Sequence, residues 1–229
     1  MTCRPFVKMH GLGNDFVVVD ARRVPFAPDP ALARRMADRR RGIGCDQIVI
    51  VEPARNGAAD LALRFLNADG SAAGACGNGT RCAAALVMAA EDRAGLTIET
   101  AAGMLYAARA EDGRVSVDMG PAATDWAGIP LARAQDTLHL DLALGPLADP
   151  VATGMGNPHA TFFVDDIEAI DIATLGPALE HDPLFPERAN IGVAQLIGPD
   201  RLRLRVWERG AGLTQACGSG ACAAAVAAA

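Results

Sequence analysis

Two stretches of this sequence align without a gap: LRFLNADGSAAGACGNG at residues 63–79 and LRVWERGAGLTQACGSG at residues 204–220. Each begins with an apolar run typical of a strand, passes through small residues to Ala-Cys-Gly-x-Gly, and continues into an Ala-rich segment. Alanine loses the least free energy on entering a helix, so residues 82–90 and 221–229 are predicted helices. The two stretches therefore predict the same strand, loop and helix twice, with a cysteine at each helix start.

A second pair of matching segments lies upstream of the first. GLGNDFVVVD at residues 11–20 resembles GMGNPHATFFVD at residues 154–165, and the shared asparagines, Asn14 and Asn157, precede the cysteines by nearly equal numbers of residues. Self-similarity at a fixed spacing indicates a repeated architecture. The chain is therefore predicted to consist of two homologous halves.

The segments between these landmarks mix both kinds of secondary structure. Strand-like runs, apolar or alternating, occur at 47–51, 96–100, 103–109, 114–119 and 201–206, and helical stretches at 29–41 and 166–180. We expect an α+β fold of two pseudo-symmetric domains, 1–119 and 120–229, each a mixed or antiparallel sheet wrapped around its Ala-rich helix. Pseudo-symmetry would place an active site in the cleft between the domains. The second domain stops inside its helix, so its C-terminal end is expected to be missing from this sequence.

Composition narrows the functional classes. The chain has 229 residues, is 51% hydrophobic and carries a net charge of −6, which argues against a nucleic-acid-binding surface. The basic cluster at residues 34–41 is interpreted as the solvated face of a helix. Charges interrupt every apolar run, so no membrane segment is predicted, and the first residues lack the apolar core of a secretory signal. The cytoplasm is therefore the expected compartment.

The two repeated cysteines, Cys76 and Cys217, are the best candidates for chemistry. A cysteine at a helix start lies among backbone N–H groups at the positive end of the helix dipole, and this setting favours thiolate and lowers the thiol pKa. The same N–H groups bind carboxylates. One such loop could hold a nucleophile, a redox thiol or a metal ligand. Two symmetric copies instead suggest a thiol on each face of an α-carbon, one removing a proton and the other delivering one.

Other chemistries find little support. No cysteine spacing combines with paired histidines as a zinc site requires. Lys8 is the only lysine, which argues against a pyridoxal phosphate aldimine, and no dinucleotide fingerprint follows a strand. We therefore expect no metal and no cofactor. Cys82 and Cys222, inside the predicted helices, are interpreted as core residues.

The motifs resemble those of the diaminopimelate epimerase family along essentially the whole chain. They are KMHGLGNDF at 8–16, GIGCDQ at 42–47, FLNADGS at 65–71, CGNGTRC at 76–82, GNPH at 156–159, PERAN at 186–190, WERGAG at 207–212 and ACGSG at 216–220. The resemblance implies cofactor-independent interconversion of LL- and meso-diaminopimelate, which supplies lysine and peptidoglycan synthesis. It is also compatible with a homodimer.

The resemblance further implies roles for individual residues. Cys76 and Cys217 match the acid/base pair, and His159 and Glu208 match polar residues beside the reacting centre. The loop residues that match α-carboxylate contacts are Gly77, Asn78, Gly218 and Ser219. The remaining matches to substrate contacts are Asn14, Gln47, Asn67, Asn157, Asn190 and Arg209; a guanidinium such as that of Arg209 can grip a carboxylate with two parallel bonds.

Two alternatives stay open at this point. A proline or hydroxyproline racemase of the same superfamily would use the same two thiols on a smaller substrate. A thiol redox or binding protein would instead cycle a Cys76–Cys217 disulfide. The polar residues around the cysteines favour the epimerase, because redox chemistry does not need them.

Overall fold

The computed structural model describes residues 4–55, 57–74 and 76–229. The chain divides into two compact units, Met1–Gly120 and Pro121–Ala229, and the boundary expected from the sequence lies one residue earlier. Among the described residues, no helix is long and apolar enough to cross a membrane.

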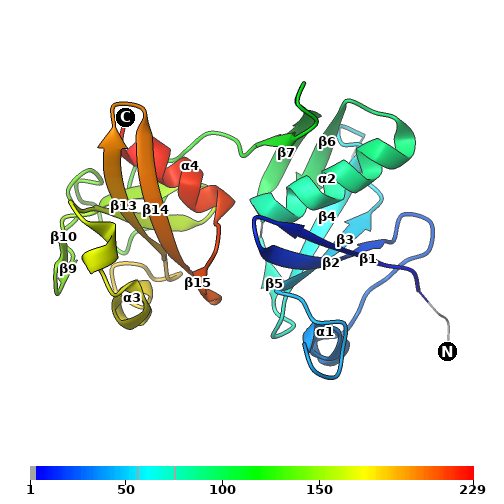
Figure 1. Ribbon diagram of the computed structural model, residues 1–229, viewed down its shortest axis with the longest axis horizontal. Coiled ribbons are helices and arrows are strands. Elements are labelled where there is room, and N and C mark those ends of the chain that lie inside the picture. The colour runs from blue at the N-terminus through cyan, green and yellow to red at the C-terminus, as the bar shows by residue number, and fades with distance from the viewer. Residues whose placement is uncertain (1–3, 56, 75) are drawn as a thin grey trace. The chain divides into compact units, whose positions relative to one another are not determined.

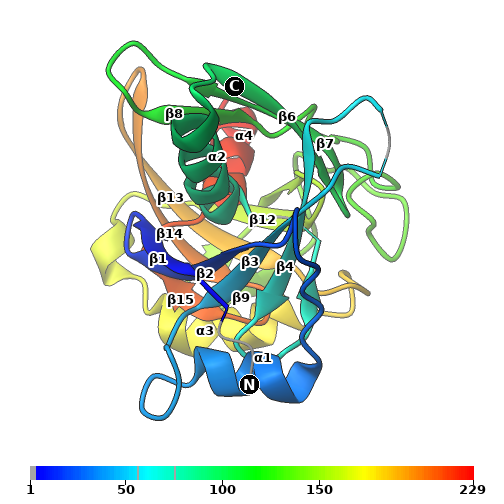
Figure 2. The ribbon, with the colours of Figure 1, turned by 90° about the vertical axis from the view of Figure 1, so that its right-hand side faces the viewer.

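Unit 1 is built on one mixed sheet with a helix on each face (Figures 1 and 2). Its strands are β1 (Val7–Gly11), β2 (Asn14–Asp20), β3 (Gln47–Glu52), β4 (Leu61–Asn67), β5 (Ala72–Ala73), β6 (Gly95–Thr100), β7 (Gly103–Arg109) and β8 (Val115–Asp118). Its helices are α1 (Pro30–Ala37) and α2 (Gly77–Glu91). The strand order is β1-β2-β3-β4-β6-β7-β8, with β5 paired to β4.

The central strands of unit 1 are apolar on both sides, as expected for strands covered by helices on both faces. Successive side chains of a strand point to opposite faces, so β2 sends Phe16 and Val18 into the core under α2 and sends Val17 and Val19 into the core that includes α1 residues. Strand β3 divides its buried side chains in the same way. The small side chains of the Ala-rich α2 let it pack closely against the sheet, and it contacts β1, β2, β3, β6, β7 and β8.

Unit 2 repeats this plan on a five-stranded sheet. Its sheet strands are β11 (Val151–Gly154), β12 (Pro158–Phe163), β13 (Asn190–Gly198), β14 (Arg201–Glu208) and β15 (Gly212–Thr214), in that order. The short strands β9 (Ala143–Leu144) and β10 (Leu147–Ala148) pair separately. Its helices are the 3-10 helix η1 (Ile167–Ala169), α3 (Ile172–Glu180) and α4 (Gly218–Ala227).

The strand pairings confirm the internal duplication. In unit 1, β1 pairs antiparallel with β2, β2 parallel with β3, and β3 antiparallel with β4. In unit 2, β11, β12, β13 and β14 pair with the same directions in the same order. In each unit a helix connects the two parallel strands, and a second helix follows the cysteine loop. The expected α+β class with two pseudo-symmetric halves is therefore confirmed.

Two predicted helices are shorter than expected. The stretch 29–41 is helical only over Pro30–Ala37, because Asp38 caps the end and its carboxylate accepts the N–H groups of Arg40 and Arg41. Three of the five arginines of the basic cluster, Arg39, Arg40 and Arg41, therefore lie on a turn and not on a helix face. The stretch 166–180 divides into η1 and α3, with Asp166 and Asp171 each capping its own short helix.

Candidate functional sites in the two units

Both repeated cysteines occupy the same structural position in their units. Cys76 is the N-cap of α2 and Cys217 the N-cap of α4, and each has an extended backbone conformation. The Cys76 Sγ accepts the N–H of Gly79 at 3.3 Å, and the Cys217 Sγ accepts the N–H of Gly220 at 3.3 Å. Each sulfur therefore takes the place of the side-chain oxygen that usually caps a helix. The prediction of a cysteine at each helix start is confirmed.

The glycine three residues after each cysteine allows the helix start to lie against the sheet. A Cβ at Gly79 would come within 3.1 Å of side-chain atoms of Phe65 and Val49. A Cβ at Gly220 would lie 3.0 Å from Val206, a residue of β14. These distances are shorter than ordinary van der Waals contacts, so glycine lets each helix approach the strands and fixes where its N-cap cysteine lies.

The candidate residues of unit 1 gather at one end of its sheet. Asn14 begins β2 and Gln47 begins the parallel β3, while Asn67 ends the antiparallel β4 directly opposite Gln47. The Asn14 Oδ1 lies 3.4 Å from Asn78 Nδ2 and 4.0 Å from Cys76 Sγ. The Gln47 Nε2 donates to Asn67 Oδ1 at 2.8 Å.

The hairpin before Asn14 explains its placement. Gly11 pairs with Asn14 across a two-residue turn formed by Leu12 and Gly13. Both turn residues have positive φ, 55° for Leu12 and 89° for Gly13, as a tight hairpin turn of type I′ requires. Leu12 tolerates this conformation with its side chain exposed. The turn therefore starts β2 at Asn14, next to the start of α2.

Gln47 offers an acceptor that the described residues do not satisfy. Its Nε2 is used by Asn67, but its Oε1 is buried and has no hydrogen-bond partner among the described residues. A buried carbonyl without a donor costs about 1–3 kcal/mol, so such a group in a native protein calls for a partner. An ammonium group of a ligand would supply the missing donor.

The candidate residues of unit 2 gather at the corresponding end of its sheet. His159 of β12 pairs with Asn190, the first residue of β13. The Asn190 side chain donates to Pro158 O at 2.9 Å and accepts the N–H of Arg209 at 3.0 Å. The Arg209 guanidinium itself donates to the Glu187 carbonyl at 2.9 Å.

His159 is buried and uncharged. Its Nε2 lies 3.0 Å from Asn157 Oδ1, an acceptor, so Nε2 carries the proton. Burial, with a smaller contribution from the nearby Arg209, lowers the pKa of His159 to about 3. A neutral imidazole at this position can orient neighbouring groups but does not add a positive charge.

Cys217 is buried, and one sequence-based expectation is wrong here. Burial and then the Glu208 carboxylate raise the pKa of the Cys217 thiol to about 12, although the Ser219 hydroxyl and the Gly220 N–H act in the opposite direction. The helix start was expected to lower this pKa. It fails to do so because a thiolate with only 8% of its residue exposed loses most of its hydration. Cys217 is therefore a thiol at neutral pH.

Glu208 links this thiol to the end of the sheet. Its carboxylate accepts hydrogen bonds from the Cys217 thiol and from the Thr214 hydroxyl. Glu208 ends β14 and pairs with Gly212 of β15, so the cysteine loop and the strand are joined by this side chain. Thr214 carries no signal in the sequence that would have identified it.

Several charged residues support these positions and were missed by sequence reasoning. In unit 1, the carboxylates of Asp15 and Asp46 hold the ends of β2 and β3 together. In unit 2, the buried Glu180 accepts hydrogen bonds from the Trp207 indole and from the N–H of Gly210, on either side of Glu208 and Arg209. Asp15 and Asp46 adjoin the candidates Asn14 and Gln47, and that adjacency was the available signal.

The core assignments of the other helical cysteines were half right. Cys82 is buried in the core under α2, as predicted. Cys222 on α4 is only half-buried, whereas the next two residues, Ala223 and Ala224, lie on the buried side of this Ala-rich helix. Among the described residues, no group of three or more His, Cys, Asp or Glu side chains is arranged to hold a metal ion.

Comparison with known proteins places these features in one family. The family model described as diaminopimelate epimerase matches residues 6–124 and 151–229. The chain is 62% identical over 226 residues to a diaminopimelate epimerase of Rhodospirillum centenum, covering 99% of this chain and 78% of that protein. It is 56% identical over 229 residues to a diaminopimelate epimerase of Phenylobacterium zucineum, covering 98% of this chain and 82% of that protein.

Solved structures show the same fold at much lower sequence identity. A hydroxyproline epimerase from Agrobacterium vitis has a TM-score of 0.66 at 19% identity, covering 96% of this chain and 75% of that chain. A PhzF-family phenazine biosynthesis protein of Bacillus anthracis has a TM-score of 0.63 at 16% identity, covering 99% of this chain and 80% of that chain. At these identities the likeness concerns the fold alone.

Proposed function

Because the chain belongs to the diaminopimelate epimerase family, we propose that it converts LL-diaminopimelate to meso-diaminopimelate, with Cys76 and Cys217 as the acid/base pair. The single observation that carries this proposal is the paired N-cap geometry. A cysteine begins each of the helices α2 and α4, and in both helices its sulfur accepts the N–H of the glycine three residues later. Inversion at an α-carbon needs one proton acceptor and one proton donor, and the duplication supplies both.

The reaction is balanced in protons. The thiolate of one cysteine removes the α-proton, and the electron pair left on carbon delocalises into the α-carboxylate. The thiol of the other cysteine then delivers its proton to the opposite face of that carbon. The configuration is inverted, the first sulfur ends as a thiol and the second as a thiolate. No electrons leave the substrate, and the two cysteines exchange protonation states.

The protonation of Cys217 suggests the starting arrangement. Burial and Glu208 raise the pKa of this thiol to about 12, so Cys217 enters as the proton donor and Cys76 as the base. In the free protein the Cys217 thiol donates a hydrogen bond to the Glu208 carboxylate, and during the reaction it would donate instead to the developing negative charge on the substrate carbon. The reverse reaction then starts with Cys217 as the base.

Backbone N–H groups at the helix starts are proposed to hold the α-carboxylate. In α2, the N–H of Gly79 and that of Thr80 are used by the Cys76 sulfur and carbonyl. The family resemblance assigns the N–H groups that would face the α-carboxylate to Gly77 and Asn78 at this helix and to Gly218 and Ser219 at α4. An anion at a helix N-terminus is stabilised by these donors and by the helix dipole.

Amides and one guanidinium are proposed to recognise the rest of the substrate. The buried Oε1 of Gln47 would accept from an ammonium group, and Arg209 would pair with the distal carboxylate. Asn14, Asn67, Asn157 and Asn190 complete the proposed contacts. His159, neutral and held by Asn157, would orient the substrate beside Cys217 without stabilising a thiolate there.

Two further proposals follow from the family. The substrate and product belong to lysine and peptidoglycan synthesis, so we place the reaction in the cytoplasm. We also expect a homodimer, which light scattering of the purified protein would test.

Hydrogen exchange at the α-carbon tests the proposed function. The protein is incubated with LL-diaminopimelate in deuterated water with a thiol reductant, and proton NMR follows loss of the α-proton and appearance of the meso isomer. We expect both signals in the unmodified protein and neither in Cys76→Ala or Cys217→Ala. Cys82→Ala and Cys222→Ala, which change a cysteine on the same two helices, are the matched controls and should stay active.

The opposite outcome is equally clear. If the folded protein exchanges the α-proton of proline but not that of diaminopimelate, it is a racemase of the same superfamily. If exchange of diaminopimelate persists in both alanine variants, the two-thiol mechanism is wrong.

A further inference from the structure

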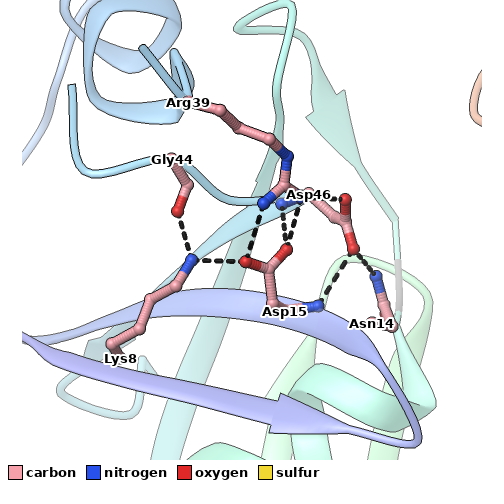
Figure 3. A network of polar contacts seen from close by, with 6 residues as sticks. All are labelled: Lys8, Asn14, Asp15, Arg39, Gly44 and Asp46. Atoms are coloured by element: carbon pink, nitrogen blue, oxygen red, sulfur yellow. Dashed lines mark hydrogen bonds and ion pairs between the residues drawn. The ribbon is translucent and has the colours of Figure 1, made fainter. Parts of the chain in front are cut away.

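Asp46 holds the amide of Asn14 in one orientation (Figure 3). Its Oδ2 accepts a hydrogen bond of 2.9 Å from Asn14 Nδ2. An ionised carboxylate accepts hydrogen bonds but donates none, so only the NH₂ side of the Asn14 amide can face Asp46. The carbonyl oxygen of Asn14 must therefore point the other way, toward Cys76 and Asn78.

The opposite end of this arrangement is fixed by a cation. The Arg81 guanidinium donates to Asn78 Oδ1, and a guanidinium has no acceptor. The NH₂ group of Asn78 is thus directed at Asn14 Oδ1, 3.4 Å away. Arg81 fixes the amide of Asn78, and Asp46 fixes the amide of Asn14. Both contacts favour the orientation in which the Asn78 NH₂ group faces the Asn14 carbonyl oxygen.

Asp46 is itself held from several sides. Its backbone N–H donates to Asp15 Oδ1 at 3.0 Å, and its Oδ2 accepts the backbone N–H of Asp15 at 2.9 Å. The Arg39 guanidinium bridges the two carboxylates, 2.7 Å from an oxygen of each. Lys8 joins the network by pairing with Asp15 and donating to the Gly44 carbonyl. Figure 3 shows this network, which joins β1, the start of β2 and the segment before β3.

We propose that Asp46 is a positioning residue for Cys76, acting through Asn14: it keeps the carbonyl oxygen of Asn14, and not its NH₂ group, facing the cysteine sulfur. A carbonyl oxygen disfavours a thiolate beside it, whereas an NH₂ group would donate to the thiolate and stabilise it. The N–H of Gly79 already stabilises negative charge on this sulfur. By withholding the Asn14 NH₂ group from this sulfur, Asp46 leaves Cys76 a stronger base.

The inference rests on the proposed function in one respect: a stronger base at Cys76 is useful because Cys76 is proposed to remove the α-proton. The protonation of Cys76 can be measured without any substrate. The charged side chains of the network around Asn14 and Asn78 are Lys8, Asp15, Arg39, Asp46 and Arg81.

The decisive variant is Asp46→Asn, which keeps the shape but lets either side of the Asn14 amide face the cysteine. Alkylation of Cys76 by iodoacetamide is followed from pH 5 to 10, and mass spectrometry of the peptide separates Cys76 from the other cysteines. We expect the pH midpoint of alkylation to fall by about half to one unit, because the Asn14 NH₂ group can then donate a hydrogen bond to the Cys76 thiolate. Asp60→Asn is the matched control: Asp60 also pairs with one arginine and accepts one backbone N–H, and this variant should leave the midpoint unchanged.

A double variant separates positioning from simple charge. Removing the negative charge of Asp46 would itself favour a thiolate nearby, whether or not Asn14 is present. If Asp46 acts through Asn14, then Asp46→Asn has its effect in the unmodified protein and almost none in an Asn14→Ala background. An unmoved midpoint in Asp46→Asn, or an equal shift in both backgrounds, overturns the proposal.

The unmodified protein provides a second test in case Asp46→Asn does not fold. In nitrogen-15 NMR, one Nδ2 proton of Asn14 should be shifted downfield by the carboxylate and exchange slowly with water. An Asn14 side-chain amide with the shifts and exchange rates of a free asparagine contradicts the proposed orientation. Both tests read Asn14 and Cys76 directly, so they can fail while the epimerase activity is found, or succeed while it is not.

Discussion

Cys76 and Cys217 share one cap geometry but differ in burial. Each sulfur accepts the N–H of the glycine three residues later at 3.3 Å. Cys217 is nevertheless buried, with Glu208 beside it, whereas Cys76 is only partly buried, with Asn14 beside it. The duplicated helix start therefore places its two thiols in different surroundings.

Removing the charge of Glu208 should make Cys217 more reactive. Burial is the largest cause of its raised pKa and the Glu208 carboxylate the next, so Glu208→Gln lowers that pKa without exposing the thiol. Because Cys217 is protonated at pH 8, we expect its alkylation rate to rise about three- to tenfold, in line with a shift of up to one pKa unit. The measurement is peptide-resolved alkylation by a small reagent. Glu187→Gln, at an exposed carboxylate near Arg209, is the control and should leave the rate unchanged.

His159 should make the protein sensitive to mild acid. Its pKa is about 3 in the folded state and about 6.5 when unfolded, so its contribution to stability is complete above pH 6.5 and is lost as pH falls. The loss is about 1.4 kcal/mol per pH unit below 6.5, because only the unfolded state takes up the proton. His159→Phe, which places in unit 2 the residue found at Phe16 of unit 1, should remove this dependence.

Urea unfolding at pH 7.5, 6.5 and 5.5 measures the effect. The free energy of unfolding should fall less in the variant than in the unmodified protein over this range. His139→Gln is the control with the opposite sign, because Asp149 raises the pKa of the exposed His139. Parallel pH dependences of His159→Phe and the unmodified protein would contradict the prediction.

Asp15 should stabilise unit 1 at neutral pH and cease to do so in acid. Burial alone would raise its pKa, but hydrogen bonds from Arg39 and Lys8 outweigh burial and hold the pKa well below its usual range. A depressed carboxyl pKa contributes stability that is present above the unfolded value, about 3.9, and is lost as pH falls below it. Asp15→Asn should therefore cost about 2 kcal/mol at pH 7, the scale of a charge-assisted hydrogen bond.

The cost should shrink as the unfolding measurement is moved from pH 7 to below pH 4. Asp112→Asn, at an exposed carboxylate paired with Arg114, is the control and should be nearly neutral at every pH. A cost in Asp15→Asn that does not change with pH would show that the lost contribution is packing and not charge.

Glu180 should hold the segment that carries Glu208 and Arg209. The carboxylate is buried, and it accepts the Trp207 indole N–H at 2.7 Å and the Gly210 N–H at 2.9 Å. In Glu180→Gln the new NH₂ group must face one of these donors, so one buried N–H loses its acceptor. We expect a loss of about 1–3 kcal/mol in the free energy of unfolding by urea. Glu168→Gln, in the exposed pair with Arg203, should change it by less than about 0.5 kcal/mol, and an equal loss in both variants would contradict the prediction.

Local sequence was sufficient for the repeat and for the helix starts. Ala-Cys-Gly-x-Gly followed by alanines specifies a helix with cysteine at its N-cap, because propensity and capping act within a few residues. The apolar β-branched runs likewise predicted β3, β6, β7 and β14 to within a few residues. The expected end of the first helix was wrong because Asp38 caps it locally, a competition between cap and helix that residue patterns resolve poorly.

Sequence by itself therefore determined that this chain is a duplicated α+β protein with a helix-capping cysteine in each half, since those features depend on neighbours along the chain. Tertiary structure alone decided the surroundings of each cysteine. The Cys217 thiol is buried beside the Glu208 carboxylate, and the Asn14 amide is turned by the Asp46 carboxylate, 32 residues away in sequence. Desolvation and hydrogen-bond direction depend on which groups meet in space, and that is fixed only when the strands pair and the helices pack against them.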